Sequence, residues 1–334
     1  MKMPDQYLVQ TENLRKYFEI RAGFLSRGSV YARAVDDVSF GIPRGSVFGL
    51  VGESGCGKTT TGRLLLRLID PTDGRILFDG TDIASFSPRE LKRVRRNMQI
   101  IFQDPYDSLN PRMSVRQIVS EPLRTHGIGD TEEEREEMIL KVLENVEMEP
   151  PQEFIARYPH ELSGGQRQRV AIARALVQSP KFVVADEPVS MLDVSIRAGV
   201  LNLLADLKNT YGLTMLFITH DLGVARYISD HLAVMYLGRI VEMGPTEEVI
   251  NKPLHPYTQA LIAAVPRPDP SHKLTEREIP VTGEVASAVN IPPACRFHPR
   301  CPFATELCRT VDPPFVDELI RGHYVACHYA SKFA

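Results

Sequence analysis

The eight residues from Gly52 to Thr59 constrain the fold of this 334-residue chain more than any other feature. They read Gly-Glu-Ser-Gly-Cys-Gly-Lys-Thr, which fits the G-x-x-x-x-G-K-[ST] pattern of a phosphate-binding loop. The apolar run Ser46–Val51 before the loop predicts a buried strand. The segment Thr59–Ile69 after it has helical spacing, with three leucines on one face, Leu64, Leu65 and Leu68. A strand, a glycine-rich turn and a helix are the context that such a loop requires.

The residue types in the loop predict how a nucleotide would be held. Glycines let backbone N–H groups turn toward phosphate oxygens. We expect Lys58 to bridge the β- and γ-phosphates, the Thr59 hydroxyl to ligate Mg²⁺ and Thr60 to bond the α-phosphate. Cys56 is interpreted as a small space-filling residue. The predicted nucleotide-binding set is Gly52, Glu53, Ser54, Gly55, Cys56, Gly57, Lys58, Thr59 and Thr60.

Two adjacent acids follow a second short apolar run, Phe182–Ala185. We expect Asp186 to hold Mg²⁺, directly or through water, and Glu187 to orient or deprotonate the attacking water. Phosphoryl transfer to water needs an aligned nucleophile and charge neutralisation more than covalent help. The competing interpretation of adjacent acids after a strand is a solvated turn, which the presence of the phosphate loop disfavours.

Composition and patterning describe the rest of the chain. A net charge of -3 gives no global basic field, so we expect no nucleic-acid partner. No apolar run approaches the roughly 20 residues that span a bilayer, and residues 1–11 lack a secretory signal layout. The run Thr214–Thr219 predicts a further parallel strand, so strands and helices alternate in an α/β core. A Pro-rich stretch from about Pro245 predicts a linker or extended surface segment.

The pentapeptide Leu162-Ser-Gly-Gly-Gln166 resembles the signature of the ABC ATPase family. A Ser and two Gly at a helix N-terminus form an anion site from exposed N–H groups. The resemblance implies that Ser163, Gly164, Gly165 and Gln166 complete the γ-phosphate pocket of a facing subunit, with two ATP molecules between two chains. It also implies an ABC-type, RecA-like P-loop core with an N-terminal antiparallel β subdomain and an inserted helical subdomain.

Further positions are similar to the family one by one. Gln103 matches the glutamine loop that touches Mg²⁺ or water, and His220 matches the switch histidine at the γ-phosphate. Asp193 ends the loop Ser190–Asp193 through which protomers communicate. Met191 there replaces the usual small residue, which we expect to change packing rather than chemistry. An aromatic residue after Lys16 is implied to stack on adenine, with Phe18 favoured and Tyr17 the alternative.

Two stretches narrow the resemblance to the ATPases of bacterial dipeptide and oligopeptide importers. They are Asp104–Met113, which nickel-importer ATPases share, and a tail containing His255-Pro-Tyr-Thr258 and the cysteines. The implied function is ATP hydrolysis that powers peptide import, with a nickel or other small-solute importer as the alternative. The implied domains are 1–250, a nucleotide-binding domain with a helical part at about 105–179, and 251–334, a Pro-rich linker and Cys-rich region.

The resemblance also implies partners. These are a second ATPase chain (a paralogue, or a second copy in isolation), two integral-membrane permeases and, indirectly, an extracytoplasmic peptide-binding protein. The chain would be peripheral on the cytoplasmic side of the inner membrane. The loop Arg21–Tyr31 resembles the second of the two ATPases that such importers carry. Soluble ABC proteins of DNA repair or translation are a rival class, but they carry two ATPase domains or long coiled coils.

Cys295, Cys301, Cys308 and Cys327 cluster in the tail with the spacing C-x5-C-x6-C-x18-C. Four thiolates suit Zn²⁺ or a [4Fe–4S] cluster, and structural zinc sites more often show closer pairs. The wider spacing and the importer resemblance favour [4Fe–4S], with zinc and free thiols or disulfides as alternatives. His298, His323 and His328 could substitute as ligands, but we interpret them as surface histidines.

Overall fold

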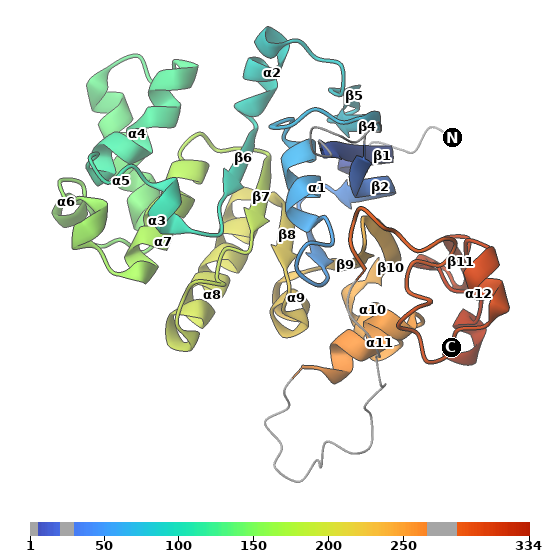
Figure 1. The fold of residues 1–334 in the computed structure, drawn as a ribbon. Helices are drawn as coiled ribbons and strands as arrows, with labels where there is room; N and C mark the ends of the chain where they lie inside the picture. The colour runs from blue at the N-terminus through green and yellow to red at the C-terminus, as the bar shows by residue number, and fades with distance from the viewer. Residues whose placement is uncertain (1–5, 21–29, 266–285) are drawn as a thin grey trace. The chain divides into compact units, whose positions relative to one another are not determined.

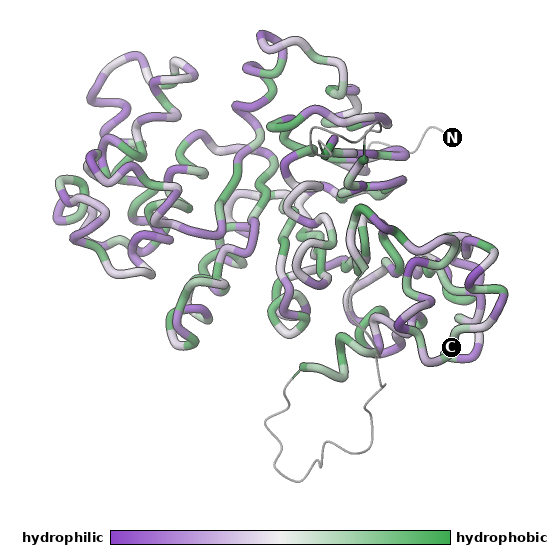
Figure 2. Tube along the Cα trace, viewed as in Figure 1, coloured by the Kyte–Doolittle hydropathy of each residue, from purple (hydrophilic) through white to green (hydrophobic). Residues whose placement is uncertain are grey.

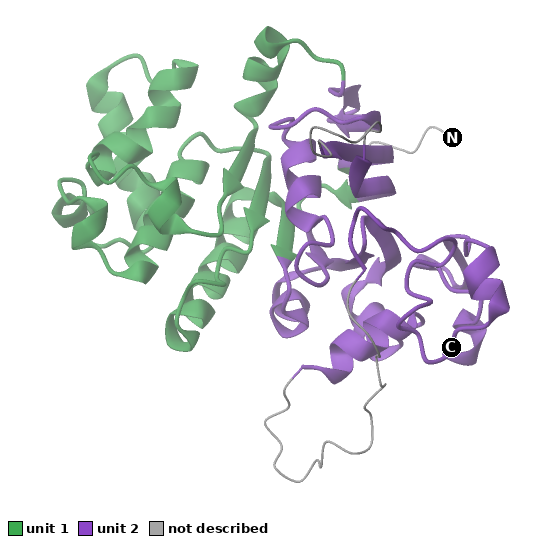
Figure 3. Ribbon diagram, viewed as in Figure 1, with its two compact units in different colours: residues 1–8, 42–46, 85–218 green, residues 9–41, 47–84, 219–334 purple. Residues whose placement is uncertain are grey.

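The computed structural model describes residues 6–20, 30–265 and 286–334, and the chain divides into two compact units. Figure 3 shows unit 1 (residues 1–8, 42–46 and 85–218) in green and unit 2 (residues 9–41, 47–84 and 219–334) in purple. Two segments discussed above lie outside the described residues. They are the loop Arg21–Tyr31, apart from its last two residues, and the stretch with the prolines from Pro266 to Pro280.

Unit 1 combines parallel strands with a group of helices (Figure 1). Strands β6 (Met98–Ile101), β7 (Phe182–Asp186) and β8 (Thr214–Thr219) pair in parallel, with Met98 opposite Phe182 and Phe182 opposite Thr214. Every residue of β7 and β8 is buried, and Figure 2 shows both as mostly hydrophobic. Continuous apolar runs are typical of parallel strands covered on both faces. These strands confirm the predicted α/β core.

The helices of unit 1 fill the interval between β6 and β7. They are α3 (Pro105–Ser108), α4 (Val115–His126), α5 (Glu132–Asn145), α6 (Pro151–Phe154) and α7 (Gly164–Leu176), with α2 (Pro88–Arg95) before β6 and α8 (Val194–Tyr211) after β7. Helix α7 is the central one, since it packs against α3, α4, α5 and α8. Its buried residues include Val170, Ala171 and Ile172. The packing therefore fixes the helix whose first residues are the predicted signature.

Unit 2 contains a four-stranded sheet in the order β2-β1-β4-β5 and the phosphate-loop strand. The sheet is formed by β1 (Tyr7–Ile20), β2 (Val30–Pro43), β4 (Asp73–Phe78) and β5 (Thr81–Asp82), and β1 and β4 are antiparallel. Strand β3 (Val47–Val51) pairs in parallel with β9 (His231–Tyr236), which pairs antiparallel with β10 (Arg239–Pro245). Helices α1 (Lys58–Leu65) and α9 (Leu222–Ile228) follow the loop and β8 in the chain.

The tail of unit 2 is built on β10. Strand β12 (His323–Val325) pairs antiparallel with β10 and with β11 (Val316–Ile320), while α12 (Glu306–Thr310) lies between Cys301 and β11 in the chain. The prediction of an extended segment from Pro245 is wrong for its first part, which forms α10 (Thr246–Asn251) and α11 (Pro256–Ala263). Proline occupies the first turn of α11, where a missing N–H costs nothing.

A buried carboxylate joins these parts of the tail. Glu242 of β10 is fully buried and accepts hydrogen bonds from the backbone N–H groups of Leu254 (2.6 Å) and His255 (3.1 Å). Its Oε1 also lies 2.8 Å from Nε2 of His323. A buried charge is tolerated only when such partners surround it. The interpretation of His323 as a surface histidine is therefore wrong, because its side chain is fully buried against Glu242.

Candidate nucleotide site

The phosphate loop turns at three glycines that have positive φ, Gly52 (154°), Gly55 (78°) and Gly57 (112°). A Cβ on Gly52 would lie 2.2 Å from the carbonyl oxygen of Met235, and one on Gly57 would lie 2.2 Å from that of Ala34. Contacts this short do not occur, so both positions require glycine for space as well as conformation. The predicted helix Thr59–Ile69 is shorter than expected, ending at Leu65, and Leu68 is 45% exposed rather than buried with Leu64.

Lys58 lies inside the loop and is 5% exposed. Its Nζ donates to the carbonyl oxygens of Gly52 (2.7 Å) and Glu53 (3.0 Å) and lies 3.8 Å from Sγ of Cys56. The ammonium is thus positioned in the concave side of the turn where phosphate oxygens are expected. Burial raises the pKa of the Cys56 thiol, so this residue is a neutral, 4% exposed side chain that fills space.

Glu53 contacts two residues that are far away in the sequence. Its backbone N–H donates to Oη of Tyr257 (2.9 Å), and its carboxylate accepts two hydrogen bonds from Arg300 (2.8 and 3.0 Å). Sequence reasoning missed both partners, since no local pattern links positions separated by 204 and 247 residues. The Cys-rich tail therefore contacts the phosphate loop directly within unit 2.

The two candidate aromatic residues on β1 have different surroundings. The Tyr17 hydroxyl donates to Oδ1 of Asp36, and burial together with this carboxylate raises the pKa of Tyr17. Phe18 is 41% exposed, with Nζ of Lys16 5.1 Å from its ring centroid. His220 of unit 2 is exposed at the residue after β8, and Thr59 and Thr60 of α1 are half-buried. Only Phe18 of the aromatic pair presents an exposed ring.

The predicted catalytic residues of unit 1 meet at the ends of its strands. Asp186 ends β7 and is 5% exposed, and Glu187 follows with a φ of 47° and donates its N–H to the carbonyl oxygen of Ile218 (2.9 Å). Nε2 of Gln103 lies 3.3 Å from Oε2 of Glu187 and donates to it. Because the carboxyl ends of parallel strands share one edge, Gln103 after β6 reaches Glu187 after β7.

The signature residues begin α7 as a capping box. Oγ of Ser163 accepts from the N–H of Gln166 (3.3 Å), and Oε1 of Gln166 accepts from the N–H of Ser163 (3.0 Å). Ser163 is exposed, so the N-terminus of this 13-residue helix faces outward from unit 1. Asp193 is also exposed before α8. Met191 is 60% exposed in the single chain, and the expectation that it changes packing stays a prediction.

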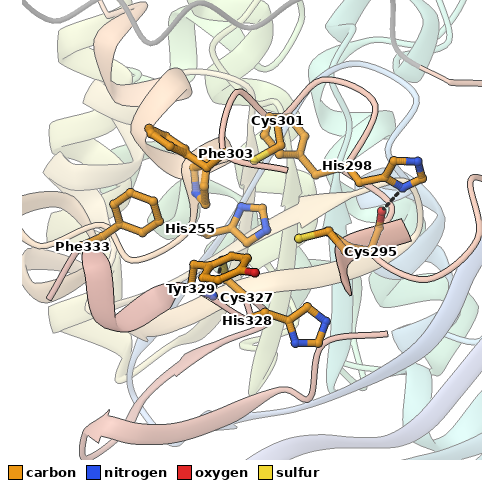
Figure 4. Close-up of a pocket in the computed structure, with 12 residues that line it drawn as sticks. His255, Cys295, His298, Cys301, Phe303, Cys327, His328, Tyr329 and Phe333 are labelled. Carbon is orange, nitrogen blue, oxygen red and sulfur yellow. Dashed lines mark hydrogen bonds between the residues drawn. The ribbon is translucent and has the colours of Figure 1, made fainter. Parts of the chain in front are cut away.

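The four tail cysteines line one pocket, together with His298 and His328 (Figure 4). Nδ1 of His298 lies 2.9 Å from the carbonyl oxygen of Cys295. Burial raises the pKa of the Cys295 thiol to about 12 and that of Cys327 to about 11, and it also raises the pKa of Cys301. None of the four forms a disulfide within the described residues.

Convergence on a pocket is not the same as a ligand set. Within residues 6–20, 30–265 and 286–334, no three His, Cys, Asp or Glu side chains are arranged to hold a metal ion. As the residues are placed, they do not fit the predicted [4Fe–4S] cluster or zinc ion.

Comparison with known proteins decides the family. The protein-family model described as "ABC transporter" matches residues 35–190. The family model described as "Oligopeptide/dipeptide transporter, C-terminal region" matches residues 241–308. A probable peptide ABC transporter ATP-binding protein of Sinorhizobium fredii is 50% identical over 98% of this chain and 91% of its own length. The chain belongs to the ATP-binding proteins of peptide ABC transporters.

Other relatives agree with this family. The oligopeptide transport ATP-binding protein AppF of Bacillus subtilis is 47% identical over 97% of this chain and 98% of its own length. Among solved structures, the chain resembles a dimeric, post-hydrolysis state of the ATP-binding cassette MJ0796 bound to ADP and Pi. The two sequences are 30% identical and the TM-score is 0.63. The match covers 71% of this chain and 98% of the MJ0796 chain. The predicted ABC ATPase fold and enzyme class are therefore confirmed.

The described part of the chain contains no helix that is both long and apolar enough to cross a bilayer.

Proposed function

We propose that this chain hydrolyses ATP to power the import of dipeptides or oligopeptides through two permeases at the cytoplasmic face of the inner membrane. The observation that carries the proposal is full-length identity of about 50% to peptide-transporter ATP-binding proteins, including the C-terminal region. The partner ATPase is a paralogue or, in the isolated protein, a second copy. An extracytoplasmic peptide-binding protein delivers the substrate.

In this proposal the phosphates of Mg·ATP occupy the loop around Lys58, and Phe18 stacks on the adenine. Its exposed ring supports Phe18 over Tyr17, whose hydroxyl already binds Asp36. Thr59, Asp186 and Gln103 hold Mg²⁺ directly or through water. The N-terminus of α7 supplies the N–H groups of Gly164 and Gly165 and a positive dipole end to the γ-phosphate of a facing chain, beside the exposed Ser163 and the Gln166 that completes its capping box.

Glu187 is the proposed base for the attacking water, with His220 at the γ-phosphate. The hydrogen bond from Gln103 to Glu187 supports this role, because it orients the carboxylate that must receive a proton. A positioned general base contributes about 10²- to 10⁴-fold in rate. In the proposal, two ATPase chains close on each other when they bind ATP. This closure can shift the conformational equilibrium of the permeases only by the difference in ATP affinity between the closed and open states.

The test compares Glu187→Gln with Glu133→Gln, an exposed carboxylate on α5. We expect Glu187→Gln to bind ATP as tightly as wild type, to lose about 10²-fold or more in phosphate release, and to accumulate as an ATP-bound dimer. Glu133→Gln should behave as wild type. Normal hydrolysis by Glu187→Gln would refute the assignment of the base.

The substrate is tested with the assembled transporter. In vesicles containing both permeases and both ATPase chains, a mixture of di- to pentapeptides with the binding protein should stimulate phosphate release, and Ni²⁺ should not. Stimulation by Ni²⁺ alone would replace peptide import with the metal-importer alternative.

The iron–sulfur assignment stays a prediction. It rests on the cysteine spacing and the importer resemblance, because the described side chains line one pocket without forming a metal-ligand set. Iron, sulfide and zinc analysis of anaerobically purified full-length protein tests it. About four irons per chain lost in Cys301→Ser would support a cluster, and bound zinc or no metal would reject it.

A further inference from the structure

The Cys-rich tail contacts the phosphate loop at Glu53. The Arg300 guanidinium forms a two-pronged ion pair with the Glu53 carboxylate, and the two side chains are 11% and 29% exposed. Two parallel charge-assisted bonds fix orientation as well as distance. Partial burial shields this pair from the solvent screening that weakens surface ion pairs.

A second contact acts on the backbone of the same residue. The Tyr257 hydroxyl accepts the N–H of Glu53, while the carbonyl oxygen of Glu53 accepts from Lys58 Nζ. The side chain, N–H and carbonyl of Glu53 are therefore all held, two of them by residues beyond position 250. These contacts orient the backbone at Glu53, whose carbonyl oxygen lies 3.0 Å from Nζ of Lys58, the predicted phosphate-binding lysine.

Both tail residues pack against the same aromatic rings, with Cζ of Arg300 5.8 Å from the ring centroid of Tyr236 and 5.9 Å from that of Phe297. The ring centroid of Tyr257 lies 4.7 Å from that of Tyr236 and 5.4 Å from that of Phe297, and Tyr236 lies 5.3 Å from Phe297. Phe297 is 1% exposed and belongs to the same hydrophobic core as Val51, the residue that ends β3. Cys295 and Cys301 pack against this core on either side of Phe297 and Arg300 in the chain. Movement of the cysteine segment would consequently move Arg300.

Charge gives Arg300 a further effect. Glu53 places an anion in a loop that is predicted to receive a triphosphate, and like charges at such distances repel. The Arg300 guanidinium neutralises this carboxylate and draws it toward the tail. Hydrogen bonds to Glu53 and Tyr236 raise the pKa of Arg300 although burial alone would lower it, so the guanidinium stays charged.

We propose that Arg300 and Tyr257 are positioning residues of the ATP site, through which the Cys-rich tail sets the affinity of the phosphate loop for ATP. This inference rests on the proposed function, in which the loop around Lys58 binds the phosphates. Neither residue touches the reacting atoms in the proposal. Their loss should therefore raise KM for ATP with little change in kcat, since they contribute equally to ground-state and transition-state binding.

The experiment measures ATP binding by the full-length protein with a fluorescent ATP analogue, and phosphate release by the assembled transporter. Arg300→Met should weaken binding about tenfold, the effect of losing roughly one charge-assisted contact. Tyr257→Phe keeps the packed ring and should weaken binding a few-fold. Arg309→Met, an exposed arginine of α12 in the same tail, is the matched control and should bind within twofold of wild type.

A double variant separates positioning from a general loss of structure. Glu53→Gln removes the anion that Arg300 neutralises, so Glu53→Gln/Arg300→Met should bind ATP at least threefold more tightly than Arg300→Met alone. By reciprocity of linked binding, ATP should also slow amide exchange in the segment 295–308 of wild type, and less so in Arg300→Met.

Three outcomes would overturn the proposal. They are binding by Arg300→Met within twofold of wild type, no recovery in the double variant, and a change confined to kcat. Lys58→Ala distinguishes this failure from failure of the proposed function. If Lys58→Ala loses ATP while Arg300→Met does not, only the tail inference fails; if Lys58→Ala binds ATP normally, the loop assignment itself fails.

Discussion

Replacing Gly57 by alanine tests whether the geometry of the phosphate loop is as constrained as the structure indicates. The new Cβ would lie 2.2 Å from the carbonyl oxygen of Ala34 on β2 and 2.8 Å from Cε of Met235. Real Cβ atoms essentially never approach within 3.0 Å, so two backbone segments must separate by at least 0.8 Å. The φ of 112° is also outside the regions that alanine prefers.

The expected magnitude combines two costs. Forced positive φ costs an alanine roughly 1–2 kcal/mol, and overpacking against a rigid neighbour costs roughly 1–3 kcal/mol. Gly57→Ala should therefore lower the free energy of unfolding by about 2–5 kcal/mol, a large share of the 5–15 kcal/mol typical of native proteins. ATP binding should be lost, because the loop cannot keep its turn.

Gly55→Ala is the matched control, since its φ of 78° is also positive but a Cβ there meets no atom within 4 Å. It should cost only the conformational part, about 1–2 kcal/mol. Urea unfolding monitored by circular dichroism, with unchanged slope in both variants, gives the comparison. A difference of less than about 0.5 kcal/mol between the free energies of unfolding of the two variants would lie within the usual scatter of surface substitutions. Such a result would show that the packing argument is wrong.

Two further predictions concern buried groups of unit 2. Burial lowers the pKa of His255 to about 3, whereas the pKa of an unfolded histidine is near 6.5. Below about pH 6.5 the unfolded state therefore binds more protons than the folded state. The free energy of unfolding consequently falls as the pH falls through this range. Between pH 7.5 and 5, the free energy of unfolding of wild type should fall by about 2 kcal/mol more than that of His255→Asn. Asparagine is chosen because its amide oxygen can still accept from the N–H of Tyr257. Equal losses for the two proteins in urea unfolding would contradict this. Arg296→Met should cost about 3–5 kcal/mol because it removes the buried guanidinium partner of Asp36, which is 5% exposed and keeps only the Tyr17 hydroxyl and the more distant Arg15. The double variant Asp36→Leu/Arg296→Met should recover part of that loss in thermal or urea unfolding, and an equally unstable double variant would count against the ion-pair explanation.

Local features of the site were predictable because neighbouring residues determine them. The glycine pattern from Gly52 to Gly57 predicts the turn, and Ser163 with Gln166 three positions later is the pattern of a capping box. The hydrogen bond between Gln103 and Glu187 follows from the shared edge of parallel strands, although only family resemblance pointed to that glutamine.

Contacts that depend on tertiary packing were not predictable in the same way. Leu68 fits a helical stripe, yet α1 ends three residues earlier and leaves it exposed. The prolines after Pro245 predict an extended segment, but they begin or flank short helices there. Nothing near His323 indicates that its partner is Glu242, 81 residues earlier, since the pair forms only when β12 adds to β10.

The buried carboxylate of Glu242 makes the tail difficult to exchange between relatives. A transplanted C-terminal segment would need a histidine opposite this carboxylate, an arginine opposite Glu53 and another opposite Asp36. A chimera that carried the cysteines without these counterparts would leave Glu242, Glu53 and Asp36 without the partners that they have here. The tail and the ATPase core are therefore expected to be inherited together, as one unit of variation.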